Sequence, residues 1–179
     1  MKRVLLVLLS IISILINAQN PTENYPVTWK FSHEQVSNNQ VDLKFAAFIF
    51  DGDHLYTQDT SNVVPTYFSF NESHVYNKIG SVSEEESIQG YDPQFDIISS
   101  YFENKTTFIQ RIQVLSEDQI TVNGQIDYIA CNEERCYFPM DPQDFSFNIR
   151  ITDRFEENIL GCMDSTQSNY NPKATADDG

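Results

Sequence analysis

The sequence VDLKFAAFI, residues 41–49, places an apolar side chain at every second position. The same period of two occurs in TTFIQRIQV at residues 106–114 and in FSFNIRI at residues 145–151. Successive side chains of a strand point to opposite faces, so each stretch predicts a strand with one face on a core. Shorter strands are predicted at Val27–Phe31, His54–Gln58, Thr66–Phe70 and Gln125–Ile129.

The amino-acid usage also favours strands over helices. Residues 19–179 hold 13 Ile, 13 Phe, 9 Val and 9 Tyr, but only 5 Ala and 4 Leu. β-branched and aromatic side chains suit a pleated sheet, whereas Ala and Leu lead the helix scale. Seven or eight short strands with turn formers between them predict an all-β antiparallel sandwich. Ile97–Phe102 is predicted as a helical turn or a loop, and Asn123-Gly124 as a hairpin turn or a bulge within a longer strand.

The N-terminus has the pattern of an export signal. Lys2 and Arg3 precede the apolar run Val4–Ile16, which is too short to span a bilayer. We therefore expect a signal peptide at residues 1–18, a β-sandwich domain at 19–153, and a linker with a short C-terminal element at 154–179. The mature chain is expected in the periplasm or outside the cell, without stable insertion in the membrane.

The charge excludes one class of partner. Loss of Lys2 and Arg3 with the leader changes the formal net charge from −15 to −17. Such a chain repels phosphate backbones, so nucleic-acid binding is not expected.

Cys131 and Cys136 are the cysteines that can pair locally, because four residues between them allow a tight turn. In an exported protein a close pair is commonly a structural disulfide. A six-residue loop, however, contributes only about 2 kcal/mol by chain entropy, and short-loop pairs include many redox pairs. Spacing alone leaves both interpretations open.

Around this pair the sequence resembles the N-terminal domain of DsbD-type thiol:disulfide interchange proteins. The most specific part is QIDYIAC at 125–131 followed by CYFP at 136–139 and FSF at 145–147. Supporting matches lie at Trp29–Phe31, Gly52–Tyr56, Pro65-Thr66 and Tyr91–Phe95. The resemblance covers roughly residues 25–151 and implies an immunoglobulin-like sandwich. Best-known members have one more residue between the cysteines and a proline where this chain has Phe138. They also have a transmembrane electron supplier, whereas this chain is expected to hold only the soluble module.

The resemblance also implies roles for individual residues. Cys136 would form mixed disulfides with partners, and Cys131 would resolve them. His54, Tyr56 and Tyr137 would be active-site neighbours. The family covers its cysteines with a loop that carries a Phe, and Asp92–Asp96 aligns with that loop, so Phe95 would be a lid. The alternative for Phe95 is an ordinary core residue.

The other histidines and the C-terminal segment give no prediction of a catalytic or metal site. His33 and His74 are expected on the surface, and no His has ligand spacing to the cysteines, so neither a metal nor a cofactor is predicted. The segment from Gly161 to Gly179 resembles a short repeat of exported Bacteroidetes proteins that normally has paired cysteines at its ends. Residues 161–179 contain one cysteine, Cys162, which is therefore expected to be free.

Two functions follow. The first is an exported thiol–disulfide exchange module, an oxidoreductase component, that relays reducing equivalents through Cys131 and Cys136. Its partners would be thioredoxin-fold proteins or a membrane thiol reductant. The second is a passive immunoglobulin-like binding or adhesion module whose disulfide is merely structural.

Overall fold

The computed structural model describes residues 20–152, 161–174 and 177, and within these ranges the chain forms twelve strands. Their bounds are β1 Val27–Gln35, β2 Gln40–Ile49, β3 His54–Tyr56, β4 Tyr67–Phe70, β5 Tyr76–Ser83, β6 Ile88–Asp92, β7 Ile97–Glu103, β8 Lys105–Val114, β9 Ile120–Asp127, β10 Ala130–Cys131, β11 Cys136–Tyr137 and β12 Gln143–Ile149. The predicted signal peptide at 1–18 and the segment 153–160 of the predicted linker lie outside the described residues. No helix within those residues is long and apolar enough to cross a membrane.

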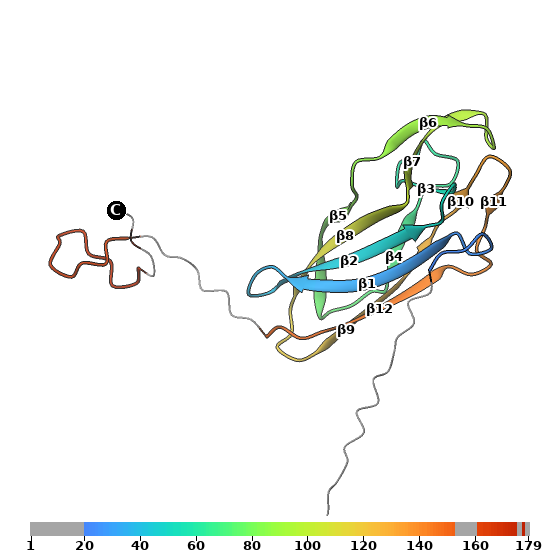
Figure 1. Ribbon diagram of the computed structural model, residues 1–179. Helices are drawn as coiled ribbons and strands as arrows, with labels where there is room; N and C mark the ends of the chain where they lie inside the picture. The colour runs from blue at the N-terminus through green and yellow to red at the C-terminus, as the bar shows by residue number, and fades with distance from the viewer. Residues whose placement is uncertain (1–19, 153–160, 175–176, 178–179) are drawn as a thin grey trace, which may run out of the picture.

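The strands form three antiparallel sheets (Figure 1). Their orders are β1-β2-β8-β5, β12-β9-β4 and β11-β10-β3-β7-β6. The first two sheets face each other across the main core, where the Phe45 ring lies 4.9 Å from Phe145 and 5.0 Å from Phe68 between ring centres. The third sheet lies at one end of this sandwich, at the upper right of Figure 1. The predicted all-β, immunoglobulin-like sandwich is confirmed.

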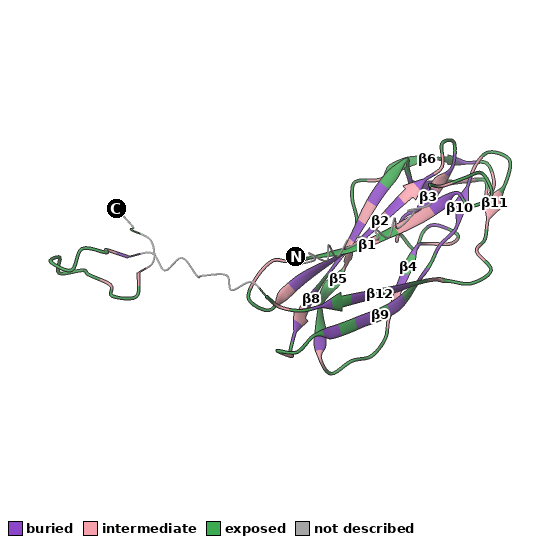
Figure 2. Cartoon of the chain, turned by 60° about the horizontal axis from the view of Figure 1, so that its bottom comes forward, coloured by how far each residue is buried: buried purple, intermediate pink, exposed green. Residues whose placement is uncertain are grey.

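The alternation in the sequence becomes alternation of burial (Figure 2). Every second residue of β9 is buried, and the same holds for most of β8 and β12. The buried positions of β2 include Val41, Leu43, Phe45 and Ala47, all with no exposed surface. The period of two therefore identified the strands that supply the main core.

Several local predictions were wrong. Ile97–Phe102 is neither a helical turn nor a loop but most of β7, which pairs with β3 on one side and β6 on the other. Strands β5 and β6 were not predicted, because both are edge strands with mainly exposed side chains and so lack an apolar period. Tyr91 and Asp92 are the last two residues of β6.

Asn123 and Gly124 lie inside β9, so the hairpin interpretation was wrong. The register with β12 runs without a break from Ile120–Ile149 to Ile126–Gln143, and no bulge interrupts it. Glycine is needed here for space. A Cβ at position 124 would come 2.0 Å from the Ser69 carbonyl oxygen and 2.4 Å from the Phe145 ring.

The C-terminal segment forms a small structure of turns. A short bridge joins Cys162 to Tyr170, and the Asn171 amide donates to the Cys162 carbonyl at 2.9 Å. Asp164 accepts hydrogen bonds from the Thr166 amide and hydroxyl. Cys162 is a free thiol, as predicted.

Candidate functional site

Cys131 and Cys136 form a disulfide that closes the β10–β11 hairpin. The two residues face each other across the strands, with Cα atoms 4.0 Å apart. The next pair in the hairpin is hydrogen bonded, since the Asn132 amide donates to the Arg135 carbonyl at 2.9 Å. The cysteines thus occupy a non-hydrogen-bonded pair, where opposite side chains come closest.

Asn132 organises the turn between the cysteines. Its side-chain oxygen accepts the amides of Glu134 and Arg135 at 2.9 and 3.0 Å, and its side-chain nitrogen donates to Asp53 at 2.9 Å. Burial raises the pKa of Asp53, and the hydrogen bond from Asn132 opposes that change. Asn132 therefore ties the turn to the chain segment that leads into β3.

The two sulfur-bearing residues differ in exposure. Cys131 is completely buried, whereas Cys136 is half-buried. Cys136 lines a small cavity of about 250 Å³ together with Glu23, Asn24, Pro26, Asp53, Arg135 and Tyr137. Of the two disulfide-bonded cysteines, Cys136 is therefore the one with exposed surface.

The face of the third sheet that carries Cys131 is separate from the main core. Cys131 lies opposite His54 in the register of β10 and β3, and Tyr56 lies opposite Tyr101 in β3 and β7. Leu55, between His54 and Tyr56, points the other way into the main core. The aromatic rings on the outer face lie close together, with 4.6 Å between the ring centres of His54 and Tyr101.

A loop at residues 92–96 joins β6 to β7 and folds over this face; we call it the lid loop. Its Phe95 is half-buried and packs on a small cluster formed by Tyr56, Ile129 and Cys131, which Val64, Tyr101 and Cys136 also contact. The Phe95 and Tyr56 ring centres are 6.1 Å apart. Phe95 thus belongs to the cluster at the disulfide and is not among the residues of the main core.

Hydrogen bonds at Gln94 and at Asp92 hold the lid loop in place. The Gln94 side-chain amide donates to the Glu133 carbonyl, in the turn between the cysteines, at 2.7 Å. At the start of the loop, Asp92 is almost completely buried. Its carboxylate accepts hydrogen bonds from the Tyr56 hydroxyl, the Ser99 hydroxyl and the backbone amide of Gln94. The lid loop is therefore connected both to the sheet below it and to the cysteine hairpin beside it.

The titratable rings at the site are largely shielded from water. Burial lowers the pKa of His54, although Asp92, Glu103 and Asp53 oppose that change. His54 Nε2 is 3.9 Å from Asp92 Oδ2, beyond hydrogen-bond distance, and has no hydrogen-bond partner among the described residues. Burial and the hydrogen bond to Asp92 raise the pKa of Tyr56.

The charge of Arg135, the residue before Cys136, is engaged by Glu23. Its guanidinium donates to the backbone carbonyl of Glu23 at 2.6 Å and lies 3.3 Å from the Glu23 carboxylate. The neighbouring Glu133 and Glu134 are exposed. The positive charge beside the cysteine pair is therefore already partnered by the N-terminal segment.

The structure brings the predicted site residues together. Tyr56 and Phe95 pack at the disulfide, and His54 lies opposite Cys131 in the register. Tyr137 follows Cys136 in β11, but its ring packs against Tyr25. His33 and His74 are exposed, as predicted. Among the described residues, no group of His, Cys, Asp and Glu side chains is placed to hold a metal ion.

Sequence reasoning missed three polar residues that build the site. Asn132 had a local signal, since an Asn directly before a short polar turn commonly bonds to amides two and three residues later. Asp92 and Gln94 fall in the loop that the resemblance placed over the cysteines, but their polar contacts had no local signal, because their partners Tyr56 and Glu133 lie more than 35 residues away along the chain.

No protein-family model matches the chain, and no curated protein matches it. Among solved structures, the N-terminal periplasmic domain of ScsB from Proteus mirabilis matches with a TM-score of 0.53 and 13% identity, over 76% of this chain and 51% of that one. The chain thus spans about half the length of that ScsB domain. At this identity the similarity concerns the fold.

Two further matches are to Neisseria meningitidis structures. The reduced DsbD N-terminal domain matches with a TM-score of 0.43 and 17% identity, over 67% of this chain and 83% of that one. The complex between the DsbD and PilB N-terminal domains matches with a TM-score of 0.42 and 15% identity, over 68% of this chain and 80% of that one.

Proposed function

We propose that this chain is an exported thiol–disulfide exchange module that works through Cys131 and Cys136. The observation that carries the proposal is the unequal exposure of the two cysteines, with Cys131 fully buried and Cys136 open to a small cavity. Exchange needs one sulfur that a partner can reach and a second that stays close behind it. A disulfide that only stabilised the hairpin would not need this asymmetry.

The exchange runs through two substitutions at sulfur. In the reduced protein the Cys136 thiolate attacks one sulfur of the partner's disulfide, and the other sulfur leaves as a thiolate. The Cys131 thiolate then attacks the Cys136 sulfur, which breaks the mixed disulfide and releases the partner's second thiolate. The partner gains two electrons and, on protonation, two protons, and this chain is left with the Cys131–Cys136 disulfide found in the structure.

The residues around the pair would protect and position it. Phe95 would act as a lid that shields the sulfurs from small oxidants, and Tyr56 would support the lid loop through Asp92. The His54 ring, in contact range of Tyr101 and Tyr56, would fill the space behind Cys131. Tyr137 would contact an approaching partner, because it borders the cavity at Cys136.

The likeness to the ScsB domain supports this proposal at the level of the fold, and the sequence resemblance to DsbD-type domains supports it at the cysteines. That ScsB domain is periplasmic, which agrees with the export signal expected at residues 1–18. The partners would be thioredoxin-fold proteins or a membrane thiol reductant.

The reduction potential of the pair tests the proposal against a passive module with a structural disulfide. A relay should equilibrate with glutathione or dithiothreitol buffers at about −120 to −270 mV, the range of known exchange proteins. A value below about −300 mV would identify a structural disulfide and favour the adhesion module. The measurement should use a Cys162→Ser background, so that the free Cys162 thiol does not contribute.

A further inference from the structure

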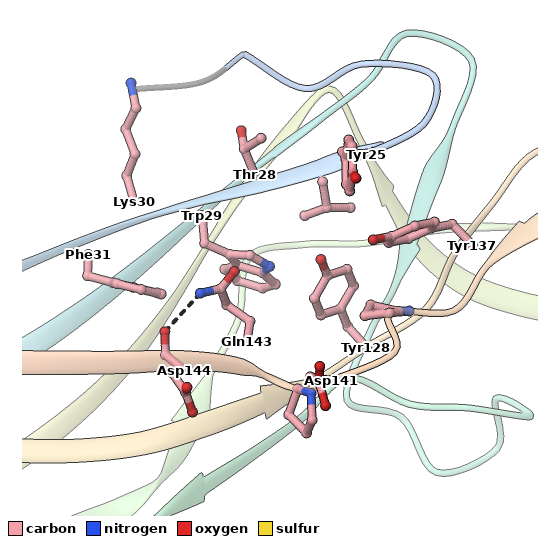
Figure 3. Close-up of a pocket in the computed structure, with 13 residues that line it drawn as sticks. Tyr25, Thr28, Trp29, Lys30, Phe31, Tyr128, Tyr137, Asp141, Gln143 and Asp144 are labelled. Carbon is pink, nitrogen blue, oxygen red and sulfur yellow. Dashed lines mark hydrogen bonds between the residues drawn. The ribbon is translucent and has the colours of Figure 1, made fainter. Parts of the chain in front are cut away.

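A groove of about 830 Å³ lies between β1 and β12, the edge strands of the two facing sheets (Figure 3). Trp29 and Tyr128 lie between the two strands, with 5.5 Å between their ring centres. Tyr25 and Tyr137 form one end of the groove, with ring centres 6.2 Å apart. The groove therefore ends at the residue that follows Cys136.

The β1 side of the groove is a free backbone edge. The Phe50 amide donates to the Pro26 carbonyl at one end of β1, and the Val36 amide donates to the Gln40 carbonyl at the other. Hydrogen-bonded pairs alternate along an antiparallel ladder, so the backbone groups of Thr28 and Lys30 are the ones that form hydrogen bonds with β2.

The alternate residues of β1, namely Val27, Trp29 and Phe31, must then direct their amides and carbonyls away from β2. All three line the groove. β1 has a hydrogen-bonded neighbour on one side only within the described chain. Three donors and three acceptors, spaced as in a strand, are thus presented to whatever enters the groove.

The β12 side is different, because its edge is partly capped. The Gln143 side-chain amide donates to the Asp144 carbonyl at 2.9 Å, as the dashed line in Figure 3 marks. An added strand would consequently pair with β1, with β12 and its side chains as the opposite wall.

Exposed apolar side chains continue from the groove along the segment between β11 and β12. Met140 is 99% exposed and Phe138 is 59% exposed, and their neighbours Pro139 and Asp141 line the groove. Apolar surface of this kind commonly marks a docking site. The charged residues that line the groove are Lys30, Asp141 and Asp144. The Lys30 amine lies over the Phe48 ring, and the Asp144 carboxylate bonds to Gln125 of β9.

We propose that the groove binds an extended segment of the exchange partner's polypeptide, which adds to β1 as a strand and leads to Cys136. The identity of the partner rests on the proposed function, since the mixed disulfide at Cys136 holds the partner's chain next to Tyr137. A free row of backbone donors and acceptors is matched by another polypeptide backbone, and side chains of the added strand would enter between Tyr25, Trp29 and Tyr128.

The test uses the oxidised full mature chain and a peptide that cannot exchange disulfides. The probe is an octapeptide with a Lys at each end and alternating Thr and Val between them. One inner position carries Ser, and the cysteine-containing version carries Cys at that same position. The chain has a single tryptophan, Trp29, so its fluorescence reports occupation of the groove. The peptide should shift Trp29 emission in a saturable way.

Two N-methylated isomers of the probe identify the binding mode. An added strand uses every second amide, so methylation of one alternate set should weaken binding at least about tenfold and methylation of the other should be tolerated. Tyr25→Ala should also weaken binding several-fold. Tyr67→Ala is the matched control, because Tyr67 is similarly exposed, at 62% against 65%, and does not line the groove.

The other outcomes separate this proposal from the proposed function. Exchange at Cys136 without any peptide effect on Trp29 would overturn the groove and leave the exchange function standing. Peptide binding without exchange by the cysteine-containing version of the probe would support the groove and overturn the exchange function. Equal binding of both methylated isomers would overturn strand addition by a partner. So would an emission shift with oligosaccharides only, or a shift that comes from concentration-dependent self-association of the chain.

Discussion

The Tyr56 hydroxyl donates a hydrogen bond to the carboxylate of Asp92, the residue at which β6 ends and the lid loop begins. Both side chains are almost completely buried, and the same carboxylate also accepts the Gln94 amide within the loop. One buried group thus fixes the start of the lid loop to β3, which lies next to the strand that carries Cys131.

We expect Asp92→Asn to loosen the lid loop. Hydrogen bonds to a charged acceptor contribute about 1.5–3 kcal/mol each, and the amide keeps only part of that acceptor capacity. The free energy of unfolding in urea should fall by about 1–3 kcal/mol, and the reduced Cys136 thiol should react faster with iodoacetamide. Asp96→Asn is the control in the same loop, because Asp96 is exposed and bonds only to the Tyr91 hydroxyl among the contacts described. Unchanged stability and reactivity in Asp92→Asn would contradict the anchoring role.

Phe95→Ala should expose the sulfurs while leaving the fold largely intact. Phe95 is half-buried on the small cluster at the disulfide, so its loss should destabilise less than the roughly 3–5 kcal/mol of a fully buried Phe→Ala change. The reduced pair should react faster with hydrogen peroxide, measured by thiol titration. Phe102→Ala, in the main core, is the comparison: it should lose the full 3–5 kcal/mol. A large loss of stability in Phe95→Ala with no change in thiol reactivity would identify Phe95 as a core residue.

His54 should make the protein less stable in mild acid. Burial lowers its pKa in the folded state, against an ordinary value near 6.5 in the unfolded chain. As pH falls through 6.5 the unfolded state takes up a proton before the folded state does, so the free energy of unfolding falls until the folded-state pKa is passed. The negative charges of Asp92, Glu103 and Asp53 oppose the lowering of this pKa and so reduce the effect.

Urea unfolding at pH 8 and pH 5 measures this dependence. Every unit by which the pKa falls corresponds to about 1.4 kcal/mol of stability lost at the lower pH. His54→Gln should flatten the decline between pH 7 and pH 5, whereas His33→Gln, at an exposed position, should not. Identical declines in wild type and His54→Gln would show that His54 does not contribute.

The sequence predicted the parts of the fold in which a single face is buried. Val41–Ile49 and residues 106–114 alternate because one side of each strand meets the core, and both became strands. β5 could not be found in this way, since its edge position leaves most side chains exposed. β7 is covered on both sides, by the main core at Phe102 and by the cluster at Tyr101, so its residues show no simple alternation.

The site was predictable only in part, for a related reason. Cys131 and Cys136 are close in the sequence, so their pairing needed no knowledge of the fold. The lid loop and its support depend on contacts between distant strands. Tyr56 and Asp92 are 36 residues apart, and Gln94 and Glu133 are 39 apart. Such pairs are set by the order of strands in the third sheet, which the sequence pattern did not reveal.

Gly124→Ala tests why a turn-like dipeptide lies within β9. A methyl group there would meet the Ser69 carbonyl and the Phe145 ring, so the neighbouring strands must move apart. We expect a loss of about 2–3 kcal/mol in urea unfolding, in the range of overpacked sites. Gly80→Ala is a useful comparison, because a Cβ at position 80 meets nothing within 4 Å and only its positive φ is strained. Wild-type stability in Gly124→Ala would show that the close approach at Ser69 is relieved without cost.

Cys131→Ser and Cys136→Ser should differ in their reaction with an oxidised thioredoxin-fold partner. Cys136 borders a cavity, so in Cys131→Ser it should attack the partner and form a mixed disulfide that persists, because the resolving thiol is absent. In Cys136→Ser the remaining Cys131 thiol has no exposed surface and should form little complex. Non-reducing electrophoresis and intact mass measure the complex.

The comparison of the two variants requires a Cys162→Ser background, because the free Cys162 thiol is partly exposed and would itself form mixed disulfides. Iodoacetamide reactivity of each single thiol gives an independent measure of access and should follow the same order, with Cys136 the faster. Equal complex formation by both variants would show that exposure does not assign the roles. Failure of both to form a complex, with their thiols intact, would leave the disulfide as a structural link in a passive module.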